Sequence, residues 1–184
     1  MKALTFAACL ASLVALGTFA HADDPPEAPP PRSTTSHLDV QLEAGANLHR
    51  VYDVPIYGGE LVLGIGTERP DFAARLTLGG MVGETDVGLR ATELRIGASL
   101  EGRPNEWFRF GLDLHALYFN LARATTSDDF WGLGPGVRPY FAIDIADWSE
   151  GRLYATAGLE VAWIGGEGSG TMLWGPSVAL GLGF

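Results

Sequence analysis

The chain has almost no cysteine and almost no lysine. Its 184 residues include one cysteine, Cys9, and one lysine, Lys2, both within the first ten positions. The rest of the chain therefore offers no disulfide framework, no cysteine-based metal site and no cysteine nucleophile. The remaining positive charges are all arginines, and they are outnumbered, because the formal net charge is −10. Since no basic patch can neutralise phosphates, we expect no nucleic-acid partner.

The N-terminal residues have the pattern of a secretory signal peptide. Lys2 is followed by an apolar stretch from Ala3 to Phe19, and small residues occupy both peptidase positions of Ala20–Ala22. An uncleaved membrane anchor is the alternative, but the stretch is short against the about 20 apolar residues that span a bilayer. We predict a signal peptide over 1–22 that is cleaved after export.

The residues after this segment fall into two parts. Residues 23–36 read DDPPEAPPPRSTTS, which offers almost nothing to bury and in which prolines restrict the backbone. We predict a disordered proline-rich linker there. Residues 37–184 are then long enough for one domain and too short for two.

Residues 37–184 show alternation of apolar and polar side chains without a sustained helical period. Residues 108–118 are the clearest case, because Phe108, Phe110, Leu112 and Leu114 are each separated by one polar residue or glycine. Such alternation predicts half-exposed β-strands. We predict eight strands, over about 38–48, 57–66, 72–79, 93–100, 108–118, 137–145, 152–163 and 177–184.

Two features interrupt the alternation. Val87 and Leu89 have the opposite parity to the following strand, which suggests a bulge or a strand end that projects beyond a membrane. Pro139 and Pro176 cannot donate to a sheet ladder, so we expect both near strand ends.

The connections also alternate. Those after the second, fourth and sixth strands are tight and polar, whereas the odd ones include the long segment 120–136 and the glycine-rich segment 165–171. Short turns at one end and longer loops at the other are typical of transmembrane β-barrels.

The alternation alone fits a soluble barrel with an apolar interior or a membrane barrel with a polar one. The polar face carries arginines and carboxylates in nearly equal number, interleaved with small residues, which suits a narrow lumen in which buried charges pair. We therefore predict an all-β, eight-stranded, antiparallel up-and-down transmembrane β-barrel with a polar lumen. The predicted lumen charge network is Glu43, Glu60, Arg75, Glu93, Arg95, Arg109, Asp113, His115, Arg138, Asp144, Arg152 and Glu160.

Aromatic residues gather at the strand ends, as they do at membrane interfaces. We predict that Phe72, Trp107, Phe108, Trp148, Tyr154 and Phe184 lie near one boundary. We predict that Tyr52, Tyr57, Tyr118, Phe119, Trp163 and Trp174 lie near the other.

The last strand alternates Val178, Leu180, Leu182 and Phe184 and ends on the aromatic residue. Here the sequence resembles the bacterial outer-membrane β-barrel families, whose last strand carries an insertion signal ending in phenylalanine. The closest match in size is the small eight-stranded class of outer-membrane proteins A and X. The resemblance implies insertion by the barrel-assembly machinery into the outer membrane of a Gram-negative bacterium, in contact with the bilayer and lipopolysaccharide.

Catalytic and metal-binding patterns are weak. His115 is near Asp113 and Arg109, but its strand lacks the serine that accompanies the histidine of outer-membrane lipid A deacylases. His37 and His49 are too far apart for a metal motif, and the acidic residues Glu84, Asp86, Asp128 and Asp129 lack the spacing of a calcium loop. We expect no metal and no cofactor.

These observations favour a non-enzymatic outer-membrane barrel with a structural or surface-interaction role and a closed, charged lumen. Two alternatives stay open at this point. One is a lipid A-modifying outer-membrane enzyme that uses His115, and the other is a soluble lipocalin-like carrier in the periplasm.

Overall fold

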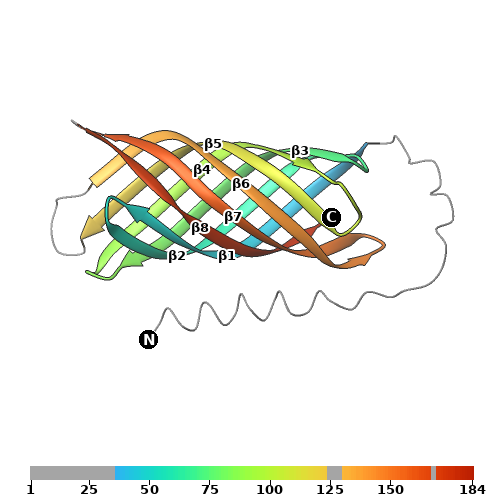
Figure 1. The fold of residues 1–184 in the computed structure, drawn as a ribbon, viewed down its shortest axis with the longest axis horizontal. Coiled ribbons are helices and arrows are strands. Elements are labelled where there is room, and N and C mark those ends of the chain that lie inside the picture. The colour runs from blue at the N-terminus through green and yellow to red at the C-terminus, as the bar shows by residue number, and fades with distance from the viewer. Residues whose placement is uncertain (1–35, 124–129, 167–168) are drawn as a thin grey trace. The chain divides into compact units, whose positions relative to one another are not determined.

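The described part of residues 37–184 forms a closed barrel of eight antiparallel strands (Figure 1). The structure is a computed structural model that describes residues 36–123, 130–166 and 169–184. Each strand pairs with its neighbours in the sequence, and the last strand pairs with the first. The predicted eight-stranded up-and-down barrel is thereby confirmed. The signal peptide at 1–22 and all of the linker except Ser36 lie outside the described residues, so both stay predictions.

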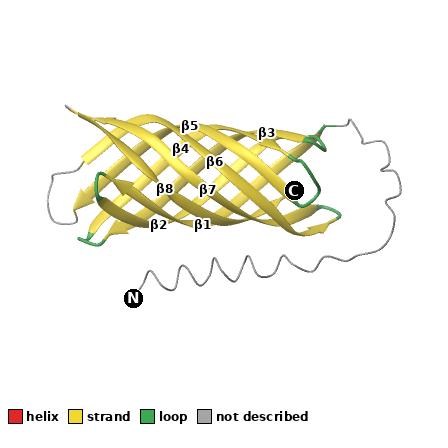
Figure 2. Cartoon of the chain, viewed as in Figure 1, coloured by secondary structure: helices red, strands yellow, loops and turns green. Residues whose placement is uncertain are grey.

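The strands are longer than the alternation predicted, with 14 to 19 residues each. They are β1 (His37–Val51), β2 (Val54–Glu68), β3 (Phe72–Thr85), β4 (Leu89–Gly102), β5 (Phe108–Arg123), β6 (Phe130–Trp148), β7 (Gly151–Gly166) and β8 (Ser169–Gly183). In Figure 2 the described residues are strands and short connections, without a helix. In this part of the chain, no helix has the length and apolar character required to cross a membrane.

The long loop predicted over 120–136 is wrong at both of its ends, and its middle, 124–129, lies outside the described residues. Residues 120–123 belong to β5, and residues 130–136 belong to β6. The glycines that suggested a loop instead allow close contact between strands, because a Cβ on Gly134 would collide with the carbonyl group of Trp163. Most of the predicted loop at 165–171 is likewise strand, in β7 and β8.

The two ends of the barrel are called proximal and distal here, and each is defined by its turns. The proximal end carries the turns 69–71, 103–107 and 149–150 together with Phe184. The distal end carries the turns 52–53 and 86–88. In Figure 1 the C-terminus therefore lies at the end opposite the β1–β2 turn.

Large apolar side chains cover the outside of the wall. Leu76 is 73% exposed, Ile96 65% and Leu180 55%, whereas Arg109 and Glu160 are fully buried inside. The membrane-type orientation is therefore confirmed, with apolar residues outward and charges inward. The same orientation contradicts a lipocalin-like carrier, whose apolar residues would point to the lumen.

This pattern reverses near the distal end. Leu117 and Phe119 of β5 are fully buried inside the barrel, while Tyr118 and Asn120 face outward. The prediction that Phe119 lies at the membrane boundary is therefore wrong. The interior of the barrel changes from charged to apolar as the strands approach the distal turns.

The reversal also accounts for the irregular parity before the fourth strand. Leu89 shares its face with the buried Ala91 and Glu93, and β4 pairs with β3 and β5 without a shift of register. Of the two explanations, the bulge is absent from this strand, and a strand end that projects beyond a membrane stays a prediction. Among the described strand pairs, a register shift occurs between Asp144 and Ala146 of β6.

The prolines lie within strands, so the prediction that they sit near the ends is wrong. Pro139 pairs with Leu112 of β5, and Pro176 pairs with Leu159 of β7. The cost of the missing N–H is confined to one side of each strand. The β6–β7 register lacks a partner for Pro139, and the β8–β1 register lacks one for Pro176.

The outward face of β5 provides a test of the orientation. Leu114, which is 53% exposed in the middle of this face, should not tolerate a charge. Leu114→Arg should lower the free energy of unfolding by about 2–4 kcal/mol, the cost of an arginine at the centre of the bilayer. Urea titration of the protein folded into lipid vesicles measures this change.

Asn120 supplies the matched control, because it lies on the same face of the same strand close to the distal end. Asn120→Arg should cost at most about 1 kcal/mol, as expected at an interface. Equal effects of the two substitutions would contradict the proposed lipid-facing surface.

Candidate functional site in the barrel lumen

All twelve side chains predicted for the lumen lie inside the barrel. Ten of them are buried, and Asp144 and Arg152 are partly buried near the proximal end. The strands place them there because alternate residues of a strand point to the same face. They do not form one continuous set, since the structure divides them into two networks.

The proximal charge network lies beside the turns 69–71 and 103–107. It consists of four arginines and four carboxylates, so its formal charges cancel. Its members are Asp39, Glu68, Arg75, Glu101, Arg103, Arg109, Asp144 and Arg152.

Glu101 connects the arginines of this network. It accepts hydrogen bonds from Arg75 at 3.3 Å and from Arg109 at 3.1 Å, and Arg103 lies 3.4 Å away. Arg109 reaches further to Asp144 at 2.8 Å. Glu101 is 1% exposed, so its carboxylate depends on these arginines for the hydrogen bonds that water would otherwise supply.

A second set of contacts ties β1, β2 and β7 together. Arg152 donates to Glu68 at 2.7 and 2.8 Å and to Asp39 at 3.1 Å. Arg75 also bonds to Asp39. These residues come from strands far apart in the sequence, so the network braces the barrel across its interior.

Tyr140 and Tyr154 also lie in the lumen. Tyr154 is fully buried, and its ring lies 4.3 Å from the guanidinium of Arg109 in a cation–π contact. Its hydroxyl donates to Glu43 at 3.2 Å and accepts from the amide of Gln41 at 3.1 Å. The prediction that Tyr154 lies at the membrane boundary is therefore wrong. A side chain at Gly181 would overlap the Tyr154 ring, so this glycine makes room for it.

The middle charge network lies between the proximal network and the distal end. Arg95 contacts Glu60 at 2.5 Å, Glu160 at 2.9 Å and Glu93 at 3.1 Å. Arg138 contacts Asp113 at 2.7 Å, and lies within 3.7 Å of Glu60 and Glu43. Two histidines complete the network, and its members are Glu43, His49, Glu60, Glu93, Arg95, Asp113, His115, Arg138 and Glu160.

The carboxylates of the middle network outnumber its arginines by five to two. The two imidazoles lie against the surplus, with His49 at 3.2 Å from Glu93 and His115 at 2.6 Å from Glu160. Each imidazole therefore lies beside a carboxylate in a buried polar cluster.

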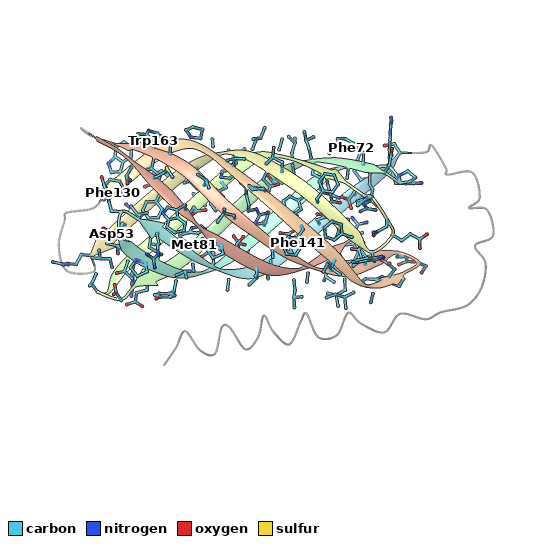
Figure 3. The ribbon with its side chains drawn as sticks, viewed as in Figure 1. Asp53, Phe72, Met81, Phe130, Phe141 and Trp163 are labelled. Atoms are coloured by element: carbon cyan, nitrogen blue, oxygen red, sulfur yellow. The ribbon has the colours of Figure 1, made fainter. Side chains whose placement is uncertain are left out.

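A distal apolar cap fills the interior between the middle network and the distal turns. In Figure 3 the labelled residues Met81, Phe130 and Asp53 lie toward the distal end, whereas Phe72 lies toward the proximal end. Phe130 packs against the cap from the rim. The cap consists of Val51, Ile56, Met81, Ala91, Leu117, Phe119, Ala162, Ile164 and Leu173.

The described lumen is filled along its length. Water reaches no part of Arg109, Glu160 or Phe119, which represent the proximal network, the middle network and the cap. A cavity of about 10 Å³ lies between the two networks, which is room for about one water molecule. The proximal mouth is wider, with a hollow of about 440 Å³ beside Trp148 and Phe184. The geometry corresponds to a plugged barrel.

The aromatic residues predicted for the membrane interfaces face outward, with the exceptions of Tyr154 and Phe119. Phe108 lies 6.0 Å from Trp107 and 6.4 Å from Phe141 between ring centroids. Trp163 is 54% exposed on β7, close to the distal end. The structure places Trp107, Phe108 and Trp148 toward the proximal end, and Tyr118, Trp163 and Trp174 toward the distal end.

The C-terminal residues lie on the outward face of β8. Leu180, Leu182 and Phe184 are exposed, and Val178 is half-buried. Phe184 exchanges two backbone hydrogen bonds with Val40, at 2.9 and 3.0 Å, which join the chain end to β1. The predicted insertion signal thus forms part of the seam that closes the barrel.

The lumen does not bring a serine to His115 through any hydrogen bond in the described residues. Ser99 bonds instead to the hydroxyl of Tyr140 at 2.9 Å, and His115 lies against Glu160. Within the described ranges, no group of three or more histidine, cysteine or acidic side chains is arranged to hold a metal ion. Glu84 and Asp86 are exposed at the distal end, whereas Asp128 and Asp129 lie outside the described residues.

The sequence pattern does not identify several lumen residues. It places Glu101 and Arg103 in a turn, and the predicted lumen network does not include Asp39, His49 or Glu68. Glu101 has the same parity as Glu93 and Arg95, so extending the predicted strand 93–100 by one residue finds it.

Comparisons with known proteins identify the fold and no closer relationship. No family model matches the chain, and no curated protein matches its sequence. Among solved structures, Neisserial surface protein A superposes with a TM-score of 0.55 at 11% identity, over 81% of this chain and 97% of that one. The N-terminal β-barrel domain of Pseudomonas aeruginosa OprF gives 0.53 at 18% identity, over 82% and 100% of the two chains. Ail, the attachment invasion locus protein of Yersinia pestis, gives 0.51 at 9% identity, over 80% and 97%. The chain has the fold of the small eight-stranded outer-membrane β-barrels.

Replacing Glu101 tests the proximal charge network. Glu101→Gln keeps the shape of the side chain but leaves Arg75 and Arg109 without their shared charge partner. The free energy of unfolding should fall by about 3–5 kcal/mol, the cost of removing one partner of a buried ion pair. Glu106→Gln, in the neighbouring turn and exposed, should change it by less than about 0.5 kcal/mol. Equal urea midpoints for the two variants would show that the network does not brace the barrel.

Proposed function

We propose that this chain is an outer-membrane β-barrel with a structural or surface-interaction role and a lumen that stays closed. The observation that carries the proposal is the opposite character of the two faces of the wall. Leucines and isoleucines cover the outside, and paired charges fill the inside. A wall of this kind is stable where lipid, not water, surrounds it.

The proposed orientation places the proximal end in the periplasm and the distal end outside the cell. Export through a cleaved signal peptide would deliver the chain to the periplasm with residues 23–36 leading into β1 at the proximal end. The outward residues that end on Phe184 would serve as the signal for the barrel-assembly machinery, which is the proposed partner during insertion.

The distal turns support a role in surface contact. Tyr52 is 61% exposed and Val87 is 65% exposed, and both lie in turns of the distal end. Tyr52 adopts a left-handed backbone with φ of 53°, which holds it at the tip of the two-residue turn. Exposed apolar residues at loop tips are suited to contact with another macromolecule.

An arginine beside an aromatic residue near the distal end supports contact with lipopolysaccharide. The guanidinium of Arg50 lies 5.8 Å from the centre of the Trp174 ring, on the outward side of the β1–β8 seam. A cation beside an interfacial tryptophan can meet lipid phosphates at the level of the headgroups.

Two features of the interior support a closed, non-catalytic barrel. The cap and both charge networks block a path along the axis, and eight strands leave little space beyond their own side chains. The lipid A-modifying alternative requires a substrate to reach His115, which is 8% exposed and lies against Glu160. We therefore propose no enzymatic activity, and His115→Ala should leave the lipid A profile of overexpressing cells unchanged.

Cell fractionation with gel electrophoresis tests the class and the location together. The protein should be found in the outer-membrane fraction and should migrate faster before boiling than after it, because the folded barrel resists detergent. A monomer that stays soluble without detergent would contradict the proposal.

Planar bilayers test the closed lumen. The reconstituted protein should give no steady ion conductance at moderate voltage, because buried side chains fill the interior of the described strands. A stable channel in preparations that contain only folded protein would show that the lumen opens.

A further inference from the structure

The middle charge network carries a surplus of negative charge, whereas the proximal network is balanced. With five carboxylates and two arginines, its formal charge is −3 if both imidazoles are neutral and −1 if both are protonated. Buried charges are stable when they are paired with opposite charges. The surplus therefore requires a further source of positive charge inside the barrel.

The first imidazole lies beside a carboxylate that otherwise shares its cation. His49 and Glu93 are both fully buried, and the Nδ1 atom of His49 lies 3.2 Å from Oε2 of Glu93. Among the described residues, the other ion-pair partner of Glu93 is Arg95 at 3.1 Å, and Arg95 also contacts Glu60 and Glu160. An imidazolium ion at position 49 gives Glu93 a positive partner of its own.

The second imidazole reaches its carboxylate across an intervening strand. His115 belongs to β5 and Glu160 to β7, yet Nε2 of His115 lies 2.6 Å from Oε1 of the fully buried Glu160. The strand between them, β6, has a glycine at position 136, where a Cβ would overlap the His115 ring. Gly136 therefore makes room for this contact.

The groups around the two imidazoles leave the surplus uncompensated. The charged ones are Glu43 of β1, Glu60 of β2, Glu93 and Arg95 of β4, Asp113 of β5, Arg138 of β6 and Glu160 of β7. At this level β3 and β8 present the uncharged residues Met81 and Ser177, which pair with Glu60 and Asn47. Within the described lumen, the imidazoles are thus the groups that can supply further positive charge.

We propose that His49 and His115 are imidazolium ions in the folded barrel, and that their pairs with Glu93 and Glu160 form a pH-sensitive lock in the lumen. The inference concerns the interior alone and does not depend on the surface role proposed above. Histidines of an unfolded chain release their protons above about pH 6.5, so holding both protons in the folded barrel costs more as the pH rises. The lock is therefore strongest in an acidic medium and weakens in an alkaline one.

The composition of the chain isolates this effect. From residue 23 onward the chain has three histidines, His37, His49 and His115, and neither cysteine nor lysine. Between about pH 6 and pH 9, histidine is then the side chain that titrates in its ordinary range. His37 is exposed at the start of β1 and supplies the matched control.

Urea titration of the chain folded into lipid vesicles, at about pH 6 and about pH 9, tests the lock. The equilibrium constant for unfolding should rise at least about tenfold between the two conditions, because the folded barrel holds protons that the unfolded chain has released. A constant that is unchanged or that falls would overturn the proposal, since buried neutral imidazoles make a fold more stable at the higher pH.

Two variants separate the buried imidazoles from the exposed one. The double variant His49→Gln, His115→Gln should reduce the change in the unfolding constant to less than about twofold. The control His37→Gln should keep the full change. A dependence that persists in the double variant, or that disappears in the control, would overturn the assignment.

Nitrogen NMR of the histidine-labelled chain in lipid vesicles detects the protons directly and needs no variant. At about pH 7.5 both ring nitrogens of His49 and of His115 should be protonated, whereas the exposed His37 should be largely neutral. A neutral ring at either buried position would overturn the proposal even where the double variant does not fold. Such a result would leave the proposed outer-membrane function standing.

Discussion

Buried charge that must be paired is the constraint on which the rest of this barrel depends. Glu101, Arg75 and Arg109 are buried, and each arginine is stabilised by its contact with Glu101. An unpaired charge in this interior would cost several kcal/mol, so the residues of different strands are tied to one arrangement. Because the arginines pair with carboxylates inside, the outside of the wall is free to be apolar.

The polarity of the inward and outward faces is reversed at the distal end. Near the distal turns the inward residues become apolar, as with Leu117 and Phe119, and polar residues such as Asn120 and Arg90 face outward. This is the pattern of a β-barrel in water. One set of strands thus combines a section that suits lipid with a distal section that suits solvent, and the buried cap fills the interior of the second.

The sequence was sufficient for the fold class because alternation of period two persists in every strand. It was also sufficient to select inward residues such as Arg95, Arg138 and Glu160, since parity alone decides their side. Parity does not say where along the axis a residue lies. For that reason Phe119 was placed at an interface, the strand ends were cut short, and Glu101 was assigned to a turn.

Other features depend on contacts between strands that no local pattern records. The glycines of β6 suggested a loop, but Gly134 is required where the strand approaches the carbonyl group of Trp163. Pro139 and Pro176 predict strand ends, yet each lies within a strand and pairs with one of its two neighbouring strands. The division of the charges into two networks likewise follows from the stagger of the strands, which is set by the closure of the whole sheet.

The contacts between lipid chains and leucine methyl groups test the central claim most directly. In a nanodisc sample with labelled methyl groups, nuclear Overhauser effects from acyl-chain protons should reach Leu76, Leu94 and Leu114, which face outward. They should not reach Leu117 or Leu173, which lie in the cap. Contacts to Leu117 without contacts to Leu114 would contradict the orientation of the wall.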